Sequence, residues 1–282
     1  MAHRTKLVSP RAKKLSRELA YVLGVHYGDK VRKKSNDLNC TDLDFINEYK
    51  KNIEKWSGFK CTKIKLLPKQ NEKWKQMYSI RLYSTDVNEF LENFNIKLLS
   101  NSNIKIKSAF LRGFFDSEGT ATITKIFTKL GRPNGYNHKI ACVNTNFRII
   151  ELCQKLLGDL AMPTIINKYQ PKRPNEKLVY QLVLRRSKNN YIKFANLVGF
   201  SIVRKQGKLL QIINNYSFTA SNEILGPYSY AMSLRAKFGY GEKKILRILK
   251  ARYSNLPITR GAIRGWIIKG SKPRVLAYAV EP

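Results

Sequence analysis

Acidic residues are scarce in this chain. Of its 282 residues, 19 are Asp or Glu and 53 are Lys or Arg, which gives a formal net charge of +34 at pH 7. The excess is too large, and too evenly spread along the chain, to come from a single basic tail. A protein of this charge attracts polyanions, so the composition predicts a nucleic-acid partner.

Cysteine and histidine are scarce as well. The three histidines fall in neither an HExxH nor a zinc-finger spacing, and the four cysteines lie far apart in the sequence. These spacings argue against a metal site built on imidazole or thiolate ligands. We expect the cysteines to be reduced and buried. They are Cys40, Cys61, Cys142 and Cys153.

Long apolar runs are also missing. No stretch approaches the ~18 to 20 continuous apolar residues of a membrane-spanning helix, so no membrane association is expected. Hydrophobic residues still make up 43% of the chain, which is enough for a substantial core. The first residues, MAHRTKLVSPRAKK, lack the cleavage pattern of a secretory signal, and we interpret them as a basic arm.

What the chain does contain is an internal repeat. The stretches LAYVLGVHYGDK (19–30) and SAFLRGFFDSEG (108–119) align with a constant offset, so that Glu118 stands 89 positions after Asp29. Small residues recur at every fourth position in both copies, as Ala20, Gly24 and Gly28 and as Ala109, Gly113 and Ser117. Because residues four apart share one helix face, the two stretches are predicted to be helices that pack closely against each other.

The pattern downstream of each motif repeats too. Helical stretches at about 42–56 and 145–157 are each followed by two extended stretches and a short helix. The extended stretches are 62–67 and 78–83 in the first copy and 164–169 and 180–185 in the second. A segment rich in Gly, Pro and Asn at 127–139 has no counterpart in the first copy and is predicted to be a hairpin.

Each copy therefore reads as helix, hairpin, helix, hairpin, helix. Two such copies predict an α+β fold with a pseudo-twofold repeat and two antiparallel sheets. We expect a first half at 1–97 with its basic arm, a second half at 98–218, and a small all-α domain with its linker at 219–282.

Asp29 and Glu118 close the two motif helices. The helix dipole disfavours negative charge at a C-terminus, and two neighbouring carboxylates also repel each other. We therefore expect a hard divalent cation such as Mg²⁺ between them, since it accepts carboxylates together with phosphate oxygens. Such a pair suits hydrolysis of a phosphodiester. Asp116 lies about 200° around the helix from Glu118 and is expected to be a cap or a supporting group.

The stretches VLGVHYGDK (22–30) and LRGFFDSEG (111–119) resemble the nine-residue motif of the LAGLIDADG homing endonucleases, in their single-chain form with two motif copies. The first copy departs from the motif, because Lys30 replaces the closing Gly and His26 and Tyr27 are bulky. The resemblance spans about residues 15–215. It implies that Asp29 and Glu118 bind the metal, together with their neighbours Gly28 and Ser117.

The resemblance further implies a monomeric, intron-encoded enzyme that cuts both strands of a long, pseudo-palindromic DNA site. Mg²⁺ or Mn²⁺ would support cleavage, whereas Ca²⁺ could bind without supporting it. The protein would be intracellular and act at DNA, in the cytoplasm or nucleoid or in an organelle. Basic residues near the acids would be Lys205 and Lys208, with Lys105 or Lys107 as a counterpart in the first half.

The family's two sheets form a saddle over DNA, and polar residues of the predicted strands are candidates for reading bases or contacting phosphates. These candidates are Lys63, Lys65, Arg81, Tyr83, Lys125, Lys139, Asn144, Lys168, Gln181 and Arg185.

The C-terminal segment has a different character. Residues 214–227 are interpreted as a linker, and the remainder resembles a helix-turn-helix of the resolvase or transposase type. Its last predicted helix, about 259–268, carries Arg260, Arg264 and Lys269 around an apolar face, as a DNA-recognition helix does. The alternative is a three-helix appendage that stabilises the main domain.

Two other functions stay open at the level of sequence. One is a catalytically silent DNA-binding regulator, because a bacterial sporulation regulator combines this fold with a C-terminal helix-turn-helix. The other is an RNA-splicing maturase, because net charge cannot separate RNA binding from DNA binding.

Overall fold

The computed structural model describes residues 13–29, 36–69, 71–127, 133–170, 177–214, 224–254, 256 and 258–273. The chain divides between Asn214 and Asn215 into two compact units, each of which is described by itself. None of the helices in these ranges has the length and apolar character needed to cross a membrane.

The first half of the larger unit begins with the first motif helix. Ser16 caps this helix, because its hydroxyl accepts a hydrogen bond from the Leu19 N–H at 3.1 Å. The elements are α1 (Arg17–Gly28), β1 (Asn36–Cys40), α2 (Leu43–Ser57), β2 (Lys65–Leu67), β3 (Met77–Leu82) and α3 (Thr85–Glu92), then a short 3₁₀ turn (Ile96–Leu99). The three strands form an antiparallel sheet in the order β1-β3-β2.

The second half repeats this order. Its elements are α4 (Ile104–Glu118), β4 (Gly119–Phe127), β5 (Pro133–Asn144), α5 (Phe147–Asp159), β6 (Thr164–Tyr169), β7 (Val179–Leu184), α6 (Lys188–Leu197) and α7 (Val203–Asn214). Its antiparallel sheet has the order β4-β5-β7-β6. The described part of the predicted hairpin at 127–139 is confirmed, because Phe127 of β4 pairs with Pro133 of β5, whereas residues 128–132 lie outside the described residues.

The two sheets correspond strand for strand, with β1, β3 and β2 matching β5, β7 and β6. The position that a counterpart of β4 would take, residues 30–35, lies outside the described residues. The predicted α+β repeat with two antiparallel sheets is confirmed.

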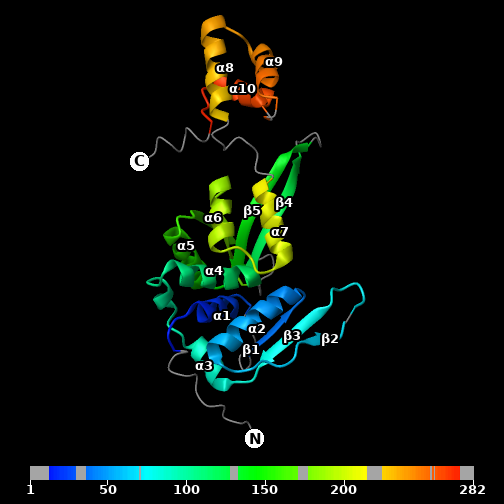
Figure 1. Ribbon diagram of the computed structural model, residues 1–282, viewed down its shortest axis with the longest axis vertical. Helices are drawn as coiled ribbons and strands as arrows, with labels where there is room; N and C mark the ends of the chain where they lie inside the picture. The colour runs from blue at the N-terminus through cyan, green and yellow to red at the C-terminus, as the bar shows by residue number, and fades with distance from the viewer. Residues whose placement is uncertain are drawn as a thin grey trace. The chain divides into compact units, whose positions relative to one another are not determined.

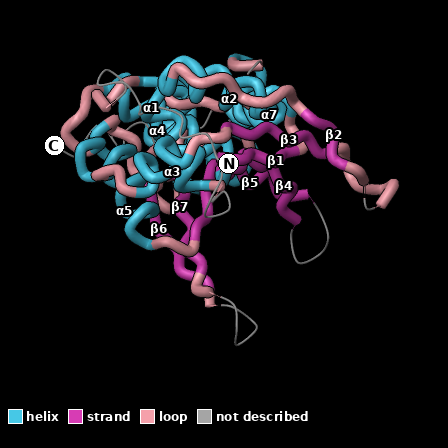
Figure 2. Tube along the Cα trace, turned by 90° about the horizontal axis from the view of Figure 1, so that it is seen from below, coloured by secondary structure: helices cyan, strands magenta, loops and turns pink. Residues whose placement is uncertain are grey.

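Helices α1 and α4 lie side by side in the middle of this unit, with one sheet to each side (Figure 1). Both sheets lie on the same side of the helices and diverge from each other (Figure 2). Helix α2 packs on β1 and β3, and α5 packs on β5, β6 and β7. Leu38, Ile80, Leu182 and Leu184 point into these layers and are almost fully buried. The opposite face of each sheet is therefore open.

The smaller unit contains three helices, α8 (Leu225–Phe238), α9 (Glu242–Arg252) and α10 (Arg260–Ile267). Gly239, with a φ of 64°, ends α8 in the left-handed conformation that glycine adopts without strain. Leu249, Ile263 and Trp266 are buried in a common core. The three predicted helices are confirmed, and the last begins after Thr259, whose hydroxyl caps it.

The predicted linker at 214–227 is too long at its end. Helix α8 starts at Leu225, so Gly226 and Pro227 lie in its first turn. Proline is tolerated there because a first-turn N–H has no partner within the helix.

Candidate metal-binding acidic site

Helices α1 and α4 touch along their small residues. A Cβ atom added at Gly24 would lie 2.7 Å from the Phe114 nitrogen, and one added at Gly113 would lie 3.1 Å from the Val25 nitrogen. Both positions face backbone atoms, which cannot rotate away as a side chain can. The predicted close packing of the two motif helices is confirmed.

The same contact continues to the C-terminal ends of the helices. A Cβ atom added at Gly28 would clash with the Ser117 hydroxyl and lie 3.2 Å from Cγ of Glu118. Asp29 follows Gly28 and caps α1, with its N–H donating to the Val25 carbonyl at 2.9 Å. The structure therefore brings together all four residues of the predicted metal site.

The two carboxyl groups perturb each other. Partial burial and the negative charge of Asp29 together raise the pKa of Glu118 to about 7, and Lys205 opposes this rise. Asp29 keeps an exposed surface, but partial removal from water still raises the pKa of its carboxyl group, again opposed by Lys205. Proximity of like charges and partial dehydration are the conditions in which a bound cation lowers the energy of both groups.

Among the described residues, Lys205 of α7 is a cation whose charge acts on both carboxyl groups. Its side chain is buried, and its Nζ donates to the main-chain oxygens of Phe115 and Asp116 at 3.2 and 2.5 Å. These oxygens belong to the last turn of α4, where the helix dipole favours positive charge. Burial lowers the pKa of Lys205, and the charge of Asp116 opposes this effect.

The other predicted basic residues lie elsewhere. Lys208 is exposed on α7, and its Nζ donates to the side chain of Gln211 at 3.2 Å. Lys107 forms an ion pair with Asp159 at 2.6 Å, and Lys105 is exposed. Of these four lysines, the structure places only Lys205 against the motif-helix end.

Asp116 holds the loop that precedes α7. Its carboxylate accepts hydrogen bonds from the Ser201 N–H at 2.8 Å, the Ser201 hydroxyl at 2.6 Å and the Tyr21 hydroxyl at 2.8 Å. Burial raises the pKa of Asp116, whereas these hydrogen bonds oppose the rise. Asp116 thus supports the site from behind, as expected, by tying α1 and α4 to the segment that leads to Lys205.

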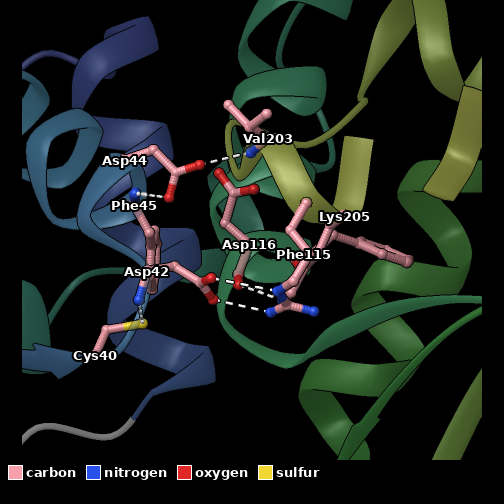
Figure 3. A network of polar contacts seen from close by, with 9 residues as sticks. Cys40, Asp42, Asp44, Phe45, Phe115, Asp116, Val203 and Lys205 are labelled. Atoms are coloured by element: carbon pink, nitrogen blue, oxygen red, sulfur yellow. Dashed lines mark hydrogen bonds and ion pairs between the residues drawn. The ribbon is translucent and has the colours of Figure 1, made fainter. Parts of the chain in front are cut away.

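Two aspartates of the first half hold the start of α7 as well. The Val203 N–H donates to Asp44 at 2.6 Å, and Arg204 forms an ion pair with Asp42 at 2.9 Å. Figure 3 shows Asp42, Asp44 and Asp116 converging on the start of α7, close to Lys205. This network was not predicted from the sequence, because its partners lie about 160 positions apart and belong to no motif.

A groove of about 1330 Å³ opens beside Glu118. Its lining includes Tyr27 and Gly28 at the end of α1 and Asn144 at the end of β5. Asn144 donates to the Tyr27 main-chain oxygen at 3.3 Å, which joins the two halves at the groove wall. Arg148 and Lys177 also line this groove, so it combines an acid with cations.

The family model of the LAGLIDADG-like domain matches residues 105–199. Residues 105–199 are thus similar to LAGLIDADG-like domains. The matched residues span α4 to α6 and include Asp116 and Glu118.

Two proteins of Methanocaldococcus jannaschii are similar in sequence. Uncharacterized protein MJ0314 is 33% identical over 156 residues, which cover 52% of this chain and 56% of that protein. Uncharacterized protein MJ0398 is 27% identical over 218 residues, which cover 71% of this chain and 73% of that protein. The chain thus spans little more than half the length of the first relative.

Two solved structures are similar in outline. I-DmoI in complex with DNA and Mn has a TM-score of 0.42 and 16% identity, and covers 66% of this chain and 97% of its own. Full-length DUF199/WhiA from Thermatoga maritima has a TM-score of 0.44 and 14% identity, and covers 97% of this chain and 98% of its own.

The donors at the ends of the two motif helices fit a hard divalent cation. They are the carboxylates of Asp29 and Glu118, with the main-chain oxygens of Gly28 and Ser117 next to them. Within the described ranges, no group of three or more His, Cys, Asp or Glu side chains could hold a metal. A cation here would therefore complete its shell with water or phosphate oxygens, which is the usual binding mode of Mg²⁺.

The open face of the first sheet carries most of its predicted polar residues. Lys65 pairs with Ser79 across β2 and β3, which places both on the face of Arg81 and away from buried Ile80. The Arg81 guanidinium donates to Asp37 at 2.6 Å and to the Tyr83 hydroxyl at 3.2 Å. These bonds raise the pKa of Arg81. Lys63 precedes β2 and is exposed.

The sheet of the second half carries its predicted polar residues on both faces. Lys139 and Gln181 lie on its open face. Lys168 and Asn144 both pair with Tyr180, in phase with buried Leu182, so they belong to the helix-covered face. They are not among the open-face residues, and their contact with DNA stays a prediction.

Two predicted contacts remain, and Lys168 has a partner of its own. Lys168 lies over the Phe147 ring at 5.9 Å, which accounts for its place at the covered edge of the sheet. Arg185 is exposed just after β7. Lys125 is a position of β4 whose side chain lies outside the described part of the structure.

The three predicted contacts of the smaller unit are all exposed on or next to α10. Arg260 forms an ion pair with Glu242 at the start of α9, whereas Arg264 and Lys269 extend the exposed basic surface. Of the cysteines, Cys142 and Cys153 are buried as expected, but Cys40 and Cys61 are only half-buried.

Proposed function

We propose that the protein is a site-specific endonuclease that hydrolyses both strands of double-stranded DNA with a divalent metal ion, and that it is intron-encoded. One observation carries the proposal. Two glycine-lined helices of a repeat end side by side, and each delivers one carboxylate to a place beside a buried lysine. A net charge of +34 supplies the attraction to DNA.

Each group at the site has a role in this proposal. Asp29 and Glu118 hold the cation, which when bound activates water and stabilises the leaving oxygen of the phosphodiester. Lys205 places a fixed positive charge beside the reacting phosphate, where charge builds up in the transition state. Asp116 and Ser201 keep Lys205 in place, because they anchor the loop that leads into α7.

The open faces of the two sheets would bind the major grooves on either side of the cleavage position. Arg81 and Lys65 of the first sheet and Lys139 and Gln181 of the second would make this contact, because they lie on the open faces. Residues 219–282 would form a separate DNA-binding domain, with Arg264 and Lys269 on its last helix. The protein would act as a monomer, because one chain already carries both acids and both sheets.

The proposal is tested with the full chain, Mg²⁺ or Mn²⁺, and a plasmid library of candidate sites. We expect one site to be linearised, and Asp29→Asn or Glu118→Gln to abolish cutting while DNA binding persists. Asp159→Asn is the matched control, because it removes an acid whose partner is the distant Lys107. If the protein binds DNA but cuts it with neither Mg²⁺ nor Mn²⁺, the proposed nuclease activity is overturned.

One observation favours a second function. The smaller unit has its own core and an exposed basic helix, which suits a regulator that binds DNA without cutting it. Binding to a specific DNA site with no cleavage would establish this function. Tighter binding to a structured intron RNA than to any DNA would instead indicate a maturase.

A further inference from the structure

Three side chains form a polar cluster on the open face of β4–β7. They are Lys139 of β5, Tyr169 of β6 and Gln181 of β7, and we call them the Gln181 cluster. Gln181 pairs with Val143 on one side and with Asn167 on the other. Lys139 and Tyr169 stand an even number of positions from these partners, so all three side chains project from one face.

The cluster is held by two hydrogen bonds to a single atom. Lys139 Nζ donates to Gln181 Oε1 at 2.7 Å, and the Tyr169 hydroxyl donates to the same oxygen at 3.0 Å. A lysine ammonium can only donate, so the atom it contacts must be the amide oxygen. Two donors occupy both lone pairs of this oxygen.

The exposed chemistry of the cluster is therefore one-sided. The Gln181 amide group keeps two N–H donors on Nε2, and none of the hydrogen bonds found among the described residues uses them. Lys139 keeps two more donors on Nζ. The phenol oxygen of Tyr169 is the remaining acceptor, at the edge of the cluster.

Bases differ in what they offer to such a surface. In the major groove, guanine presents two acceptors, N7 and O6, whereas adenine presents the N7 acceptor beside the N6 donor. A free glutamine reads adenine, because its nitrogen donates to N7 while its oxygen accepts from N6. Gln181 cannot do this, because its oxygen is already occupied by Lys139 and Tyr169.

We propose that the Gln181 cluster is a specificity-determining site that selects guanine over adenine at one position of the DNA target. The inference rests on the proposed binding of DNA against the open faces of the sheets, and it is independent of cleavage. The selection comes from Lys139 and Tyr169, which touch the same oxygen and so decide which bases Gln181 can accept.

The test is a selection of bound duplexes from a randomised library, with the full chain and EDTA so that no DNA is cut. Wild type is expected to enrich guanine at one position of the selected site. Tyr169→Phe and Lys139→Met each remove one donor from the Gln181 oxygen, and the double variant frees it fully. At that position the guanine-to-adenine ratio should fall by about 5- to 150-fold, the range of one bidentate base contact.

Lys168→Met is the matched control. Lys168 is the neighbour of Tyr169 on β6 and carries the same charge as Lys139, but it lies on the covered face of the sheet. Its loss should lower affinity for all sequences and leave the base preference unchanged. Tyr169→Phe keeps the charge and the ring, so it carries the test if the double variant does not fold.

Three results would overturn the inference. They are an unchanged preference in Tyr169→Phe and the double variant, a preference for adenine in wild type, or the same change of preference in Lys168→Met. If wild type binds no DNA, with or without metal, the proposed function is overturned instead. Failure of the base-specificity inference can therefore be distinguished from failure of the proposed function.

Discussion

Replacing Glu118 with glutamine should stabilise the metal-free protein at pH 8. The neutral amide has nearly the shape of the carboxylate, but Asp29 does not repel it. Its removal from water also costs less free energy than removal of a carboxylate does. The pKa of Glu118 rises from an ordinary 4.5 to about 7 in the folded chain. The folded state therefore binds this proton more tightly than the unfolded state does.

The sign of the pH dependence follows from this difference. Between about pH 4.5 and 7 the folded protein holds a proton that the unfolded chain has released, so stability falls as pH rises. Each tenfold change in proton affinity is worth about 1.4 kcal/mol, so a rise to about 7 gives an upper limit of about 3 kcal/mol. Solvent screening at this partly exposed site should reduce the gain to about 1 to 2 kcal/mol.

The assay is urea denaturation in EDTA at pH 5 and pH 8. Glu118→Gln should exceed wild type in free energy of unfolding at pH 8, and the difference should shrink toward pH 5. Glu18→Gln is the matched control, because Lys55 forms an ion pair with Glu18 and lowers its pKa. This variant should lose up to about 1 kcal/mol at pH 8. Equal stability of Glu118→Gln and wild type at pH 8 would refute the reasoning.

Three further outcomes are expected. Asp116→Asn should lower the free energy of unfolding by about 3 kcal/mol, because three donors lose a buried charged acceptor; Asp159→Asn, at an exposed ion pair, should cost under about 1 kcal/mol in the same denaturation assay. Gly24→Ala should lower the free energy of unfolding by more than about 3 kcal/mol, because its Cβ would meet backbone atoms. Gly158→Ala has open space around it and should change the free energy of unfolding by no more than about 1 kcal/mol. Similar values for the two variants would contradict the close packing of α1 and α4. DNA affinity, measured by fluorescence anisotropy, should fall with salt with a log–log slope of about −0.9 per phosphate contacted, and a slope near zero would argue against a long DNA site.

The helices that carry the acids were predictable because they repeat. Small residues at four-residue intervals mark a helix face in contact with another backbone, and the second copy fixes the partner of the first. Asp29 and Glu118 could be paired for the same reason, since they stand at equivalent positions of the two copies.

The choice between Lys205 and Lys208 also had a signal in the sequence. Lys205 is in helical phase with Leu209 and Ile212, four and seven positions later, and both of these are fully buried. Lys208 stands four positions before Ile212 but only one before Leu209, so it lies at the margin of this buried face. The periodicity of α7 therefore separates the buried lysine from the exposed one.

The face of Lys168 had no such signal. Its strand reads TIINKY, in which Ile165 and Ile166 are adjacent, so alternation of polar and apolar residues does not define an inner face. Only the pairing of Lys168 with Tyr180 settles the question. The partners of Asp42 and Asp44 were beyond prediction for a different reason, because hydrogen bonds between distant loops leave no periodic pattern.

The bonds from Asp42 and Asp44 to the start of α7 bear on how the chain matures on the ribosome. Arg204 is made 162 positions after Asp42, which at about 5 to 20 residues per second means a delay of roughly 8 to 30 seconds. Throughout this interval the emerging N-terminal portion lacks the cation that neutralises Asp42. The contacts of the first third of the chain can therefore form fully only after the last third has begun to emerge. We expect the nascent chain to reach its native structure late and in one concerted step.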